Sequence, residues 1–425
     1  MKDNIVSVRL WGREICRLEW LGGYKQRFGK LGAAVSFHPD YVSYGWDLDP
    51  IGPYNRSTYL VQKGLSDWCR AKDCEGLPRF LSGSLPDDWG NAVFAAWIDS
   101  RSIRHSDITP VDKLAFIGKR GMGALVFVPA LYDGISTDTP LILEELYDLS
   151  KEIQKSREGL SVDLGSHPGI GDLMAVGMSA GGMHPKAILA INWNTGEVKS
   201  GQFLLPDDFT QYILKFRDSD TWPTAEVEMA YHIMAVKSGI SMENCRLFPI
   251  EGQNHFLTER FDRKNGGKLH TATLYALNGE TYSYEQLMRV CRKMRLPYPD
   301  MEQVFRRAVF NYLSGVCDDH DKNFSFALKE DGIWRLAPAY DVTFTVNLRD
   351  RFIGDRHALS LSDKNRQVSR DDILRFADQG DIRNASHILE EIEEAIGSFQ
   401  AIASEVGIDE KVSSLILSHI YSHKP

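Results

Sequence analysis

The residues best suited to chemistry lie in one short stretch and the segment that follows it. Residues 316–326 read Val-Cys-Asp-Asp-His-Asp-Lys-Asn-Phe-Ser-Phe, and residues 336–341 read Leu-Ala-Pro-Ala-Tyr-Asp. Asp318 and Asn323 are five positions apart, which is the spacing between the base and the metal-holding amide in the catalytic loop of protein-kinase-type phosphoryl-transfer enzymes. Asp341 could supply a second metal ligand. The pattern therefore predicts a phosphoryl-transfer site.

A β-hairpin is expected to position these side chains. Phe324, Phe326 and Leu328 alternate with other residues as in a strand, Asp331-Gly332 is a turn pair, and residues 333–336 would form the return strand. Such a hairpin separates Asn323 from Asp341 and can hold both beside one cleft.

The same stretch has competing interpretations. Residues 319–330 mimic a calcium EF-hand loop, but its sixth position needs a glycine and is Phe324, and Asp331-Gly332 stands where the exit helix should begin. His320 is expected to orient the loop, with a phosphate contact as the alternative. Cys317 has no evident activating partner, so we expect a buried thiol rather than a nucleophile.

A second candidate segment is the glycine-rich loop of residues 177–186, Gly-Met-Ser-Ala-Gly-Gly-Met-His-Pro-Lys. It contains Gly-x-Ser-x-Gly, but a hydrolase nucleophile elbow needs a helix straight after the serine, and here a β-like run follows. The spacing also does not fit a Walker loop. A strand-loop-strand that covers phosphates fits better, and a plain glycine-rich turn remains the alternative.

A lysine and a carboxylate would complete the phosphate end of the site. Lys215 lies in the apolar strand 213–216 and is predicted to contact phosphate. Glu228, on a predicted helix from about 224 to 239, is placed to pair with Lys215, and Glu226 is a close competitor.

Composition bounds the class of protein. The chain has 425 residues, 43% hydrophobic and 25% charged, which is ordinary for a globular protein of two or three domains. Six scattered cysteines lack the paired spacing of a zinc site and indicate reduced thiols. No apolar leader or membrane-length run occurs, so we expect a cytoplasmic protein without a membrane segment. A net charge of −9 argues against unaided binding of nucleic acid.

The order of predicted elements indicates an α+β fold. Residues 5–37 alternate as short strands, helices are expected from Pro86 and from Pro140, and residues 155–171 resemble a linker. Strands at 186–191, ending at 215 and at 255–261 would form a small sheet, and the remaining residues are mostly helical, with capping-box patterns at Ser283 and Ser369. The predicted domains are 1–155, a β-rich N-terminal subdomain; 156–265, an N-lobe; and 266–425, a helical C-lobe.

Five motifs in this order resemble the HipA-type toxin kinases of bacterial toxin–antitoxin systems. They lie at residues 179–186, 212–215, 259–263, 318–323 and 336–341. The resemblance covers nearly the whole chain and implies a two-lobed protein-kinase-like fold with an N-terminal β-rich subdomain and an all-helical C-lobe. It implies an ATP- and Mg²⁺-dependent Ser/Thr protein kinase, with an antitoxin that carries a helix-turn-helix, DNA contact only through that complex, and a translation-factor target such as an aminoacyl-tRNA synthetase.

The resemblance also implies roles for individual residues. Asp318 would act as the base, Asn323 and Asp341 would hold magnesium, and Ser179 would be autophosphorylated. The implied ATP contacts are Ser179, Ala180, Gly181, Gly182, Met183, His184, Lys186, Lys215, Glu259, Arg260, Phe261, His320, Lys322 and Asn323. The family's acidic pair after the hinge histidine has no counterpart in residues 270–274. A lipid or small-molecule kinase of phosphoinositide-kinase-like type, and a catalytically silent corepressor, remain alternatives.

Overall fold

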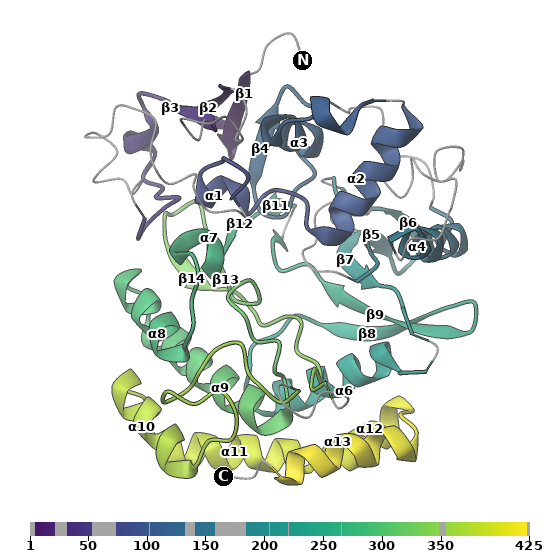
Figure 1. Cartoon of the computed structure of the whole chain (residues 1–425), viewed down its shortest axis with the longest axis vertical. Coiled ribbons are helices and arrows are strands. Elements are labelled where there is room, and N and C mark those ends of the chain that lie inside the picture. The colour runs from purple at the N-terminus through teal and green to yellow at the C-terminus, as the bar shows by residue number, and fades with distance from the viewer. Residues whose placement is uncertain are drawn as a thin grey trace. The chain divides into compact units, whose positions relative to one another are not determined.

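The chain divides into two compact units (Figure 1). The computed structural model describes residues 5–21, 32–52, 74–101, 103–131, 141–157, 184–203, 205–219, 221–264, 266–347 and 354–422. Unit 1 comprises Met1–Asp218, Pro249–Ala272 and Leu328–Ile333. Unit 2 comprises Ser219–Phe248, Thr273–Ala327 and Trp334–Pro425. The division into three domains at residues 155 and 265 stays a prediction.

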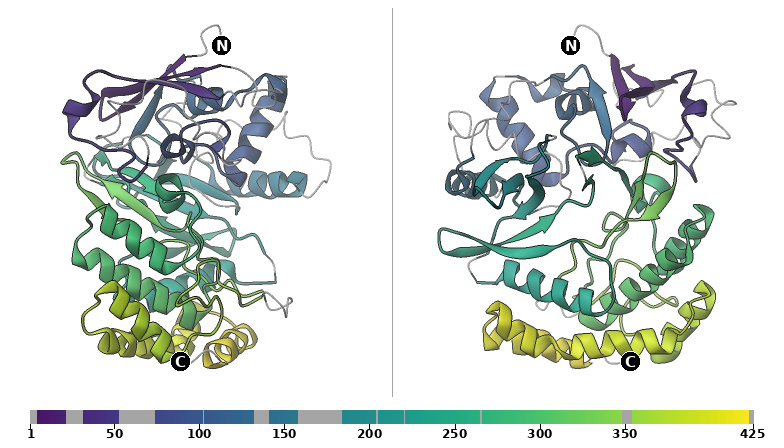
Figure 2. Two further views of the ribbon diagram at one scale, coloured as in Figure 1. Left: turned by 60° about the vertical axis from the view of Figure 1, so that its left-hand side comes forward. Right: turned by 180° about the vertical axis from the view of Figure 1, so that it is seen from behind.

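Unit 1 begins with an antiparallel sheet in the order β3-β2-β1-β4. Its strands are β1 (Ile5–Leu10), β2 (Arg13–Trp20), β3 (Ala33–Phe37) and β4 (Leu125–Val128). The purple strands β1 to β3 lie side by side in Figure 2. Gly12 turns the chain between β1 and β2 with a φ of +80°, where a side chain would be strained. The alternation predicted for residues 5–37 is therefore confirmed for the described strands.

The described helices of unit 1 follow local sequence signals. They are α1 (Arg79–Ser82), α2 (Asp88–Ser100), α3 (Pro110–Ile117) and α4 (Leu143–Arg157). The Asp87 carboxylate accepts the Gly90 N–H and caps α2, as Pro86-Asp87 predicted. On the predicted apolar face of α2, Trp89 is fully buried but Trp97 is only half-buried. Ile142 lies before α4 and is exposed.

A second sheet has the order β6-β5-β7-β9-β8. Its strands are β5 (Lys186–Asn192), β6 (Glu197–Ser200), β7 (Thr210–Lys215), β8 (Cys245–Ile250) and β9 (Gln253–Glu259). A small hairpin follows, made of β10 (Arg263–Lys264) and β11 (Gly267–Lys268). Every residue of β5 is buried, and β5 is an inner strand that pairs with β6 on one edge and with β7 on the other. The three predicted strands of this region are confirmed.

A buried ion cluster joins two segments of unit 1. The Asp262 carboxylate accepts hydrogen bonds from Arg260 Nε at 2.9 Å, from an Arg263 guanidinium nitrogen at 2.6 Å and from the Gly123 N–H at 2.7 Å. Burial alone would raise the pKa of Asp262, but the two guanidinium groups outweigh it and hold that pKa well below its usual range. Asp262 therefore stays charged and ties the loop before β4 to the segment after β9.

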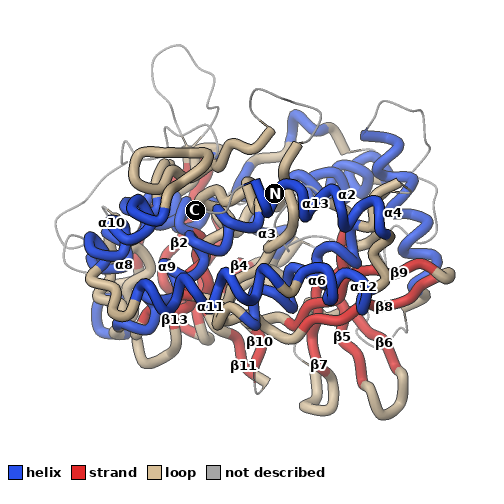
Figure 3. The backbone as a smooth tube through the Cα atoms, turned by 90° about the horizontal axis from the view of Figure 1, so that it is seen from below, coloured by secondary structure: helices blue, strands red, loops and turns tan. Residues whose placement is uncertain are grey.

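Unit 2 is mostly helical and contains most of the two strands of the predicted hairpin, whose turn, Leu328–Ile333, is grouped with unit 1. Its helices are α6 (Thr224–Lys237), α7 (Leu274–Asn278), α8 (Tyr284–Lys293), α9 (Tyr298–Ser314), α10 (Arg370–Gly380), α11 (Ala385–Gly397), α12 (Phe399–Val406) and α13 (Glu410–Ser422). A three-stranded sheet has the order β12-β13-β14, with β12 (His270–Thr273), β13 (Ser325–Leu328) and β14 (Trp334–Leu336). Gly332, at a φ of +80°, turns the chain between β13 and β14. Helix α6 packs against α11 and α12 (Figure 3).

Capping signals in unit 2 are met to different degrees. Ser369 and Asp372 form a complete capping box at α10. Ser283 caps α8, but the Gln286 side chain accepts the Tyr282 N–H instead of closing a box. Among the described residues no helix is long and apolar enough to cross a membrane.

Helix α9 leads directly into the loop that carries candidate site residues. It ends at Gly315, which has a φ of +78°, and a Cβ there would lie 2.8 Å from the His419 ring. Both the backbone conformation and the close packing therefore require glycine at this position.

We predict that Asp262→Ala destabilises unit 1 by about 3–5 kcal/mol, because it leaves two buried guanidinium groups without their carboxylate. Urea unfolding monitored by tryptophan fluorescence would measure this loss. The matched control is Asp107→Ala, which breaks the exposed pair with Arg104 and should change stability little. Equal stability of the two variants would contradict the prediction.

Candidate active site

The loop of residues 316–324 runs from α9 to β13 and carries two of the predicted catalytic residues. The amide nitrogen of Asn323 donates to the Asp318 backbone carbonyl at 2.7 Å. The Asp318 N–H donates to Thr345 Oγ1 at 2.9 Å. Both hydrogen-bonding groups of the Asp318 backbone are thus fixed, while its side chain is 62% exposed. Strand β13 begins directly at Ser325, so the EF-hand exit helix is absent at this position.

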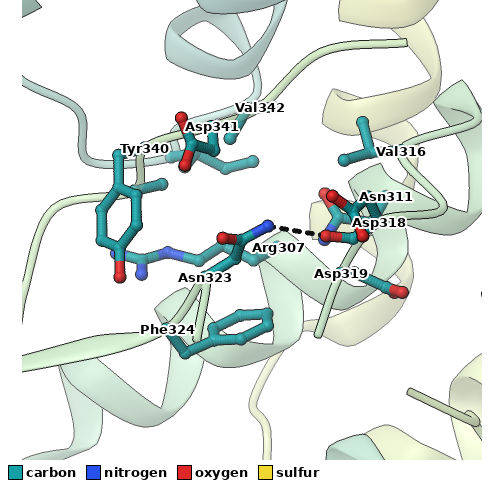
Figure 4. A pocket seen from close by; sticks show the side chains of 12 residues that line it. Arg307, Asn311, Val316, Asp318, Asp319, Asn323, Phe324, Tyr340, Asp341 and Val342 are labelled. Carbon is teal, nitrogen blue, oxygen red and sulfur yellow. Dashed lines mark hydrogen bonds between the residues drawn. The ribbon is translucent and has the colours of Figure 1, made fainter. Parts of the chain in front are cut away.

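One pocket of unit 2 brings Asp318, Asn323 and Asp341 together (Figure 4). The pocket is lined by Ile240, Arg307, Asn311, Val316, Asp318, Asp319, Asn323, Phe324, Ala339, Tyr340, Asp341 and Val342. In Figure 4 the Asn323 amide nitrogen points to Asp318 and its oxygen lies on the side of Asp341. Asp341 has a φ of +53°, a conformation that aspartate tolerates better than most residues. The predicted hairpin therefore does place these three residues beside one cleft.

The donor set of this pocket fits a magnesium ion held together with phosphates. Asn323 and Asp341 offer hard oxygen donors, and Mg²⁺ is usually bound by one or two such groups plus substrate phosphates and water. The lining includes three carboxylates and one guanidinium, which is a net formal charge of −2. No cluster of three or more histidine, cysteine or acidic side chains suited to a metal occurs in the described part of the chain. The set suits a shared ion rather than a cage made by the protein alone.

His320 and Lys322 contact the loop itself. His320 Nδ1 accepts the Lys322 N–H at 3.2 Å, and His320 Nε2 lies 3.7 Å from Asp318 Oδ1. The Lys322 ammonium lies 5.1 Å from the centre of the Tyr275 ring. These contacts agree with a loop-orienting histidine, and the ATP contacts of both residues stay predictions.

Unit 1 carries the predicted phosphate-contacting lysines. Lys186 and Lys215 are register partners across β5 and β7. Lys186 is 2% exposed, and its ammonium lies 3.4 Å from the Asp87 carboxylate at the start of α2. The Lys215 ammonium lies 5.8 Å from the centre of the Phe256 ring. Residues 179–183, with Ser179, lie outside the described part.

Two further predicted features are only partly described. The Arg260 N–H donates to the Gln211 carbonyl, so this group is already used within the sheet, whereas Glu259 and Phe261 keep their predicted adenine role. Lys215 lies in unit 1, and Glu226 and Glu228 lie on α6 of unit 2. Glu226 is buried and Glu228 is half-buried, and the ion pair with Lys215 stays a prediction.

A hydrogen-bond network around Asp319, beneath the loop of residues 316–324, was not predicted from the sequence. Asp319, which is 2% exposed, accepts hydrogen bonds from Tyr284, His357 and Ala358. The predicted burial of Cys317 is confirmed, and burial raises the pKa of this thiol to about 12. Its Sγ does have a neighbour, His357 Nε2 at 3.8 Å. The one feature of the sequence that pointed to this network is the second aspartate, Asp319, directly after Asp318.

His184, the first described residue of the glycine-rich loop, pairs with Asp218. The hydrogen bond to Asp218 raises the pKa of His184 against the opposing effect of burial. A raised pKa means that the pair stabilises the fold fully below the usual histidine value of about 6.5 and loses this effect as pH rises through the folded pKa. The ring is 71% exposed, so solvent screens the interaction.

We predict that Asp218→Asn lowers the pKa of His184, because it removes the acceptor charge that favours the imidazolium. An NMR titration of the His184 ring protons would measure the shift. Asp99→Asn, which removes the partner of exposed His105, is the control and should leave His184 unchanged. An unaltered His184 titration in Asp218→Asn would refute the assignment.

Comparisons with known proteins identify the family of the chain. The chain matches the family described as "HipA-like C-terminal domain" over residues 178–403 and that described as "HipA N-terminal domain" over residues 6–128. A putative kinase of Haemophilus influenzae is 29% identical over 185 residues, which are 39% of this chain and 52% of that protein. The chain thus spans about half the length of this curated relative.

A solved structure shares the fold over nearly the whole length. It is the toxin–antitoxin complex of HipA, HipB and operator DNA from Shewanella oneidensis MR-1, with a TM-score of 0.65 and 18% identity, covering 98% of this chain and 95% of that chain. The C-terminal family match alone spans more than half of the sequence, and the two matches follow each other in family order. This protein therefore belongs to the HipA family.

Proposed function

We propose that this chain is a cytoplasmic toxin kinase that transfers the γ-phosphate of ATP to a serine or threonine hydroxyl of another protein. The observation that carries the proposal is the pocket of unit 2, where Asp318, Asn323 and Asp341 meet in the spacing and chemistry of a phosphoryl-transfer site. Membership of the HipA family and the likeness to a putative kinase support it.

Each pocket residue has a role that follows from its contacts. The exposed Asp318 carboxylate can accept the proton of an acceptor hydroxyl, while its anchored backbone holds it in one place. The Asn323 amide nitrogen donates to the Asp318 carbonyl, and the amide oxygen would bind a cation. A bound magnesium ion would neutralise charge on the phosphates. Positioning and charge compensation would carry most of the rate.

Lys186 and Lys215 of unit 1 are the proposed phosphate-contacting lysines. The Lys186 ammonium is buried 3.4 Å from the Asp87 carboxylate, and Lys215 lies opposite Lys186 on β7. His184, charged over a wider pH range through Asp218, would assist from the end of the glycine-rich loop. Glu228 would pair with Lys215, and Glu259 and Phe261 would contact adenine.

The partners follow from the family. We propose an antitoxin with a helix-turn-helix as the regulator, DNA contact only through that complex, and a translation factor such as an aminoacyl-tRNA synthetase as target. A solved relative is a complex of HipA with HipB and operator DNA. The net charge of −9 fits a chain that needs a partner to approach DNA.

Asp318→Asn should fold normally and lose at least about 10²-fold in phosphotransfer rate, because the amide cannot take the hydroxyl proton. Labelled ATP with cell lysate would measure this and reveal the acceptor at the same time. Asp363→Asn changes the same charge at an exposed position of unit 2 and should retain full activity. Full phosphotransfer by Asp318→Asn would reject the base assignment.

Ser179 is proposed as an autophosphorylation site that switches the kinase off. A phosphate there adds about −1.5 to −2 charges. At roughly 5 Å from the nucleotide phosphates and an effective dielectric near 20, each unit pair repels by about 3 kcal/mol before screening. The modified chain should therefore bind ATP weakly.

Ser179→Asp should mimic this state, whereas Ser179→Ala should escape it. Intact-mass and peptide mass spectrometry after incubation with ATP would detect the modification, and a nucleotide titration would follow its effect. If wild type gains no phosphate on Ser179, or if the phosphorylated form binds ATP normally, the proposed switch does not exist.

A further inference from the structure

A buried carboxylate held by four hydrogen bonds lies directly beside the proposed base. Asp319 is 2% exposed, and each of its two oxygens accepts two of these bonds, none of them from an arginine or lysine. Oδ2 accepts from the Tyr284 hydroxyl at 2.7 Å and from His357 Nδ1 at 3.0 Å. Oδ1 accepts the N–H groups of Ala358 at 2.8 Å and of Leu359 at 3.4 Å. Burying such a charge is costly unless every oxygen is satisfied, as it is here.

The donors come from elements far apart in the chain. Tyr284 is the first residue of α8, and its hydroxyl also accepts the Asn311 side-chain amide of α9 at 2.9 Å. His357 lies 38 residues after Asp319 and stacks on the Tyr312 ring, with centroids 3.8 Å apart. The carboxylate therefore fastens the loop to α8, through it to α9, and to the segment of residues 357–359.

Cys317, His357 and Asp319 stand in the order of a thiol nucleophile, its base and an orienting acid. The arrangement does not activate the thiol, because burial and nearby acids raise the pKa of Cys317 to about 12. The ring instead links the two residues: His357 Nε2 lies 3.8 Å from the Cys317 Sγ, and Nδ1–H donates to the Asp319 carboxylate. The imidazole is thus a bridge between the residues on either side of Asp318.

We propose that Asp319 and His357 form a positioning pair that holds the Asp318 backbone in the geometry for proton transfer. His357 contacts both neighbours of Asp318 in the chain, Cys317 before it and Asp319 after it. The Asp318 side chain itself remains exposed. Because the neighbouring residues hold the backbone, the Asp318 carboxylate keeps its position and stays available for proton transfer. The role rests on the proposed kinase function.

His357→Ala should lower kcat at least about tenfold, because it removes both bridging hydrogen bonds of the ring. KM for ATP should change less than kcat, since most of the proposed nucleotide contacts, at residues 179–186, Lys215 and 259–261, lie outside this loop. His357→Asn keeps an N–H donor near the Nδ1 position and should recover most of kcat. Asp319→Asn combined with His357→Ala should lose little more than either alone, because the pair acts as one unit.

The stability control is Ser369→Ala, which removes the cap of α10 in the same unit without touching the loop. It should lower the melting temperature but not kcat. Amide hydrogen exchange gives a readout independent of activity: His357→Ala should speed exchange of residues 316–324, and Ser369→Ala should not.

The outcomes separate the positioning role from the kinase proposal. Unchanged exchange or unchanged kcat in His357→Ala would overturn the positioning pair. A kcat loss that Ser369→Ala reproduces, or that His357→Asn fails to restore, would reduce it to general stability and also overturn it. An inactive wild type that still shows the loop loosening in His357→Ala would reject the kinase proposal while the hydrogen-bond network stands.

Discussion

The backbone of residues 316–324 belongs to no helix or strand, so its shape depends on hydrogen bonds to its surroundings. Asp319 is the centre of these bonds, because its carboxylate joins the loop both to α8 and to residues 357–359. The packing of α8 against α9 matters to the site because it places Asn311 beside the Tyr284 hydroxyl. That hydroxyl in turn donates a hydrogen bond to the Asp319 carboxylate.

Predictions from sequence succeeded where neighbours in the chain determine the structure. The alternation of Phe324, Phe326 and Leu328 and the turn at Gly332 predicted the hairpin, which carries Asn323 and Asp341 to one pocket. The capping box at Ser369 needs only residues three positions apart. At Ser283 only one of the two hydrogen bonds of a capping box forms, because the Gln286 side chain accepts the Tyr282 N–H instead of the Ser283 N–H.

Predictions were incomplete where a side chain meets a partner far along the chain. The strand that contains Lys186 was predicted, but its Asp87 partner is 99 residues away and depends on where α2 begins. Arg260 was predicted to offer its backbone to adenine, but the pairing of its guanidinium with Asp262 in a buried cluster was not predicted. Hydrophobic period and propensity carry no information on such pairs, since they are set by packing of whole elements.

Two of the buried carboxylates, Asp262 and Asp319, show what this difference does to a site. Asp262 is surrounded by two guanidinium groups, so its charge is cancelled and it serves to join segments of unit 1. Asp319 accepts hydrogen bonds from a hydroxyl, an imidazole and backbone N–H groups rather than from an arginine or lysine. Together with Asp318 and Asp341 it lines the pocket, where Arg307 is the one guanidinium of the lining. An arginine or lysine tether would have held the loop equally well but would have placed a second permanent cation beside the pocket, so the donors that Asp319 uses hold the loop without making the site less attractive to a metal ion.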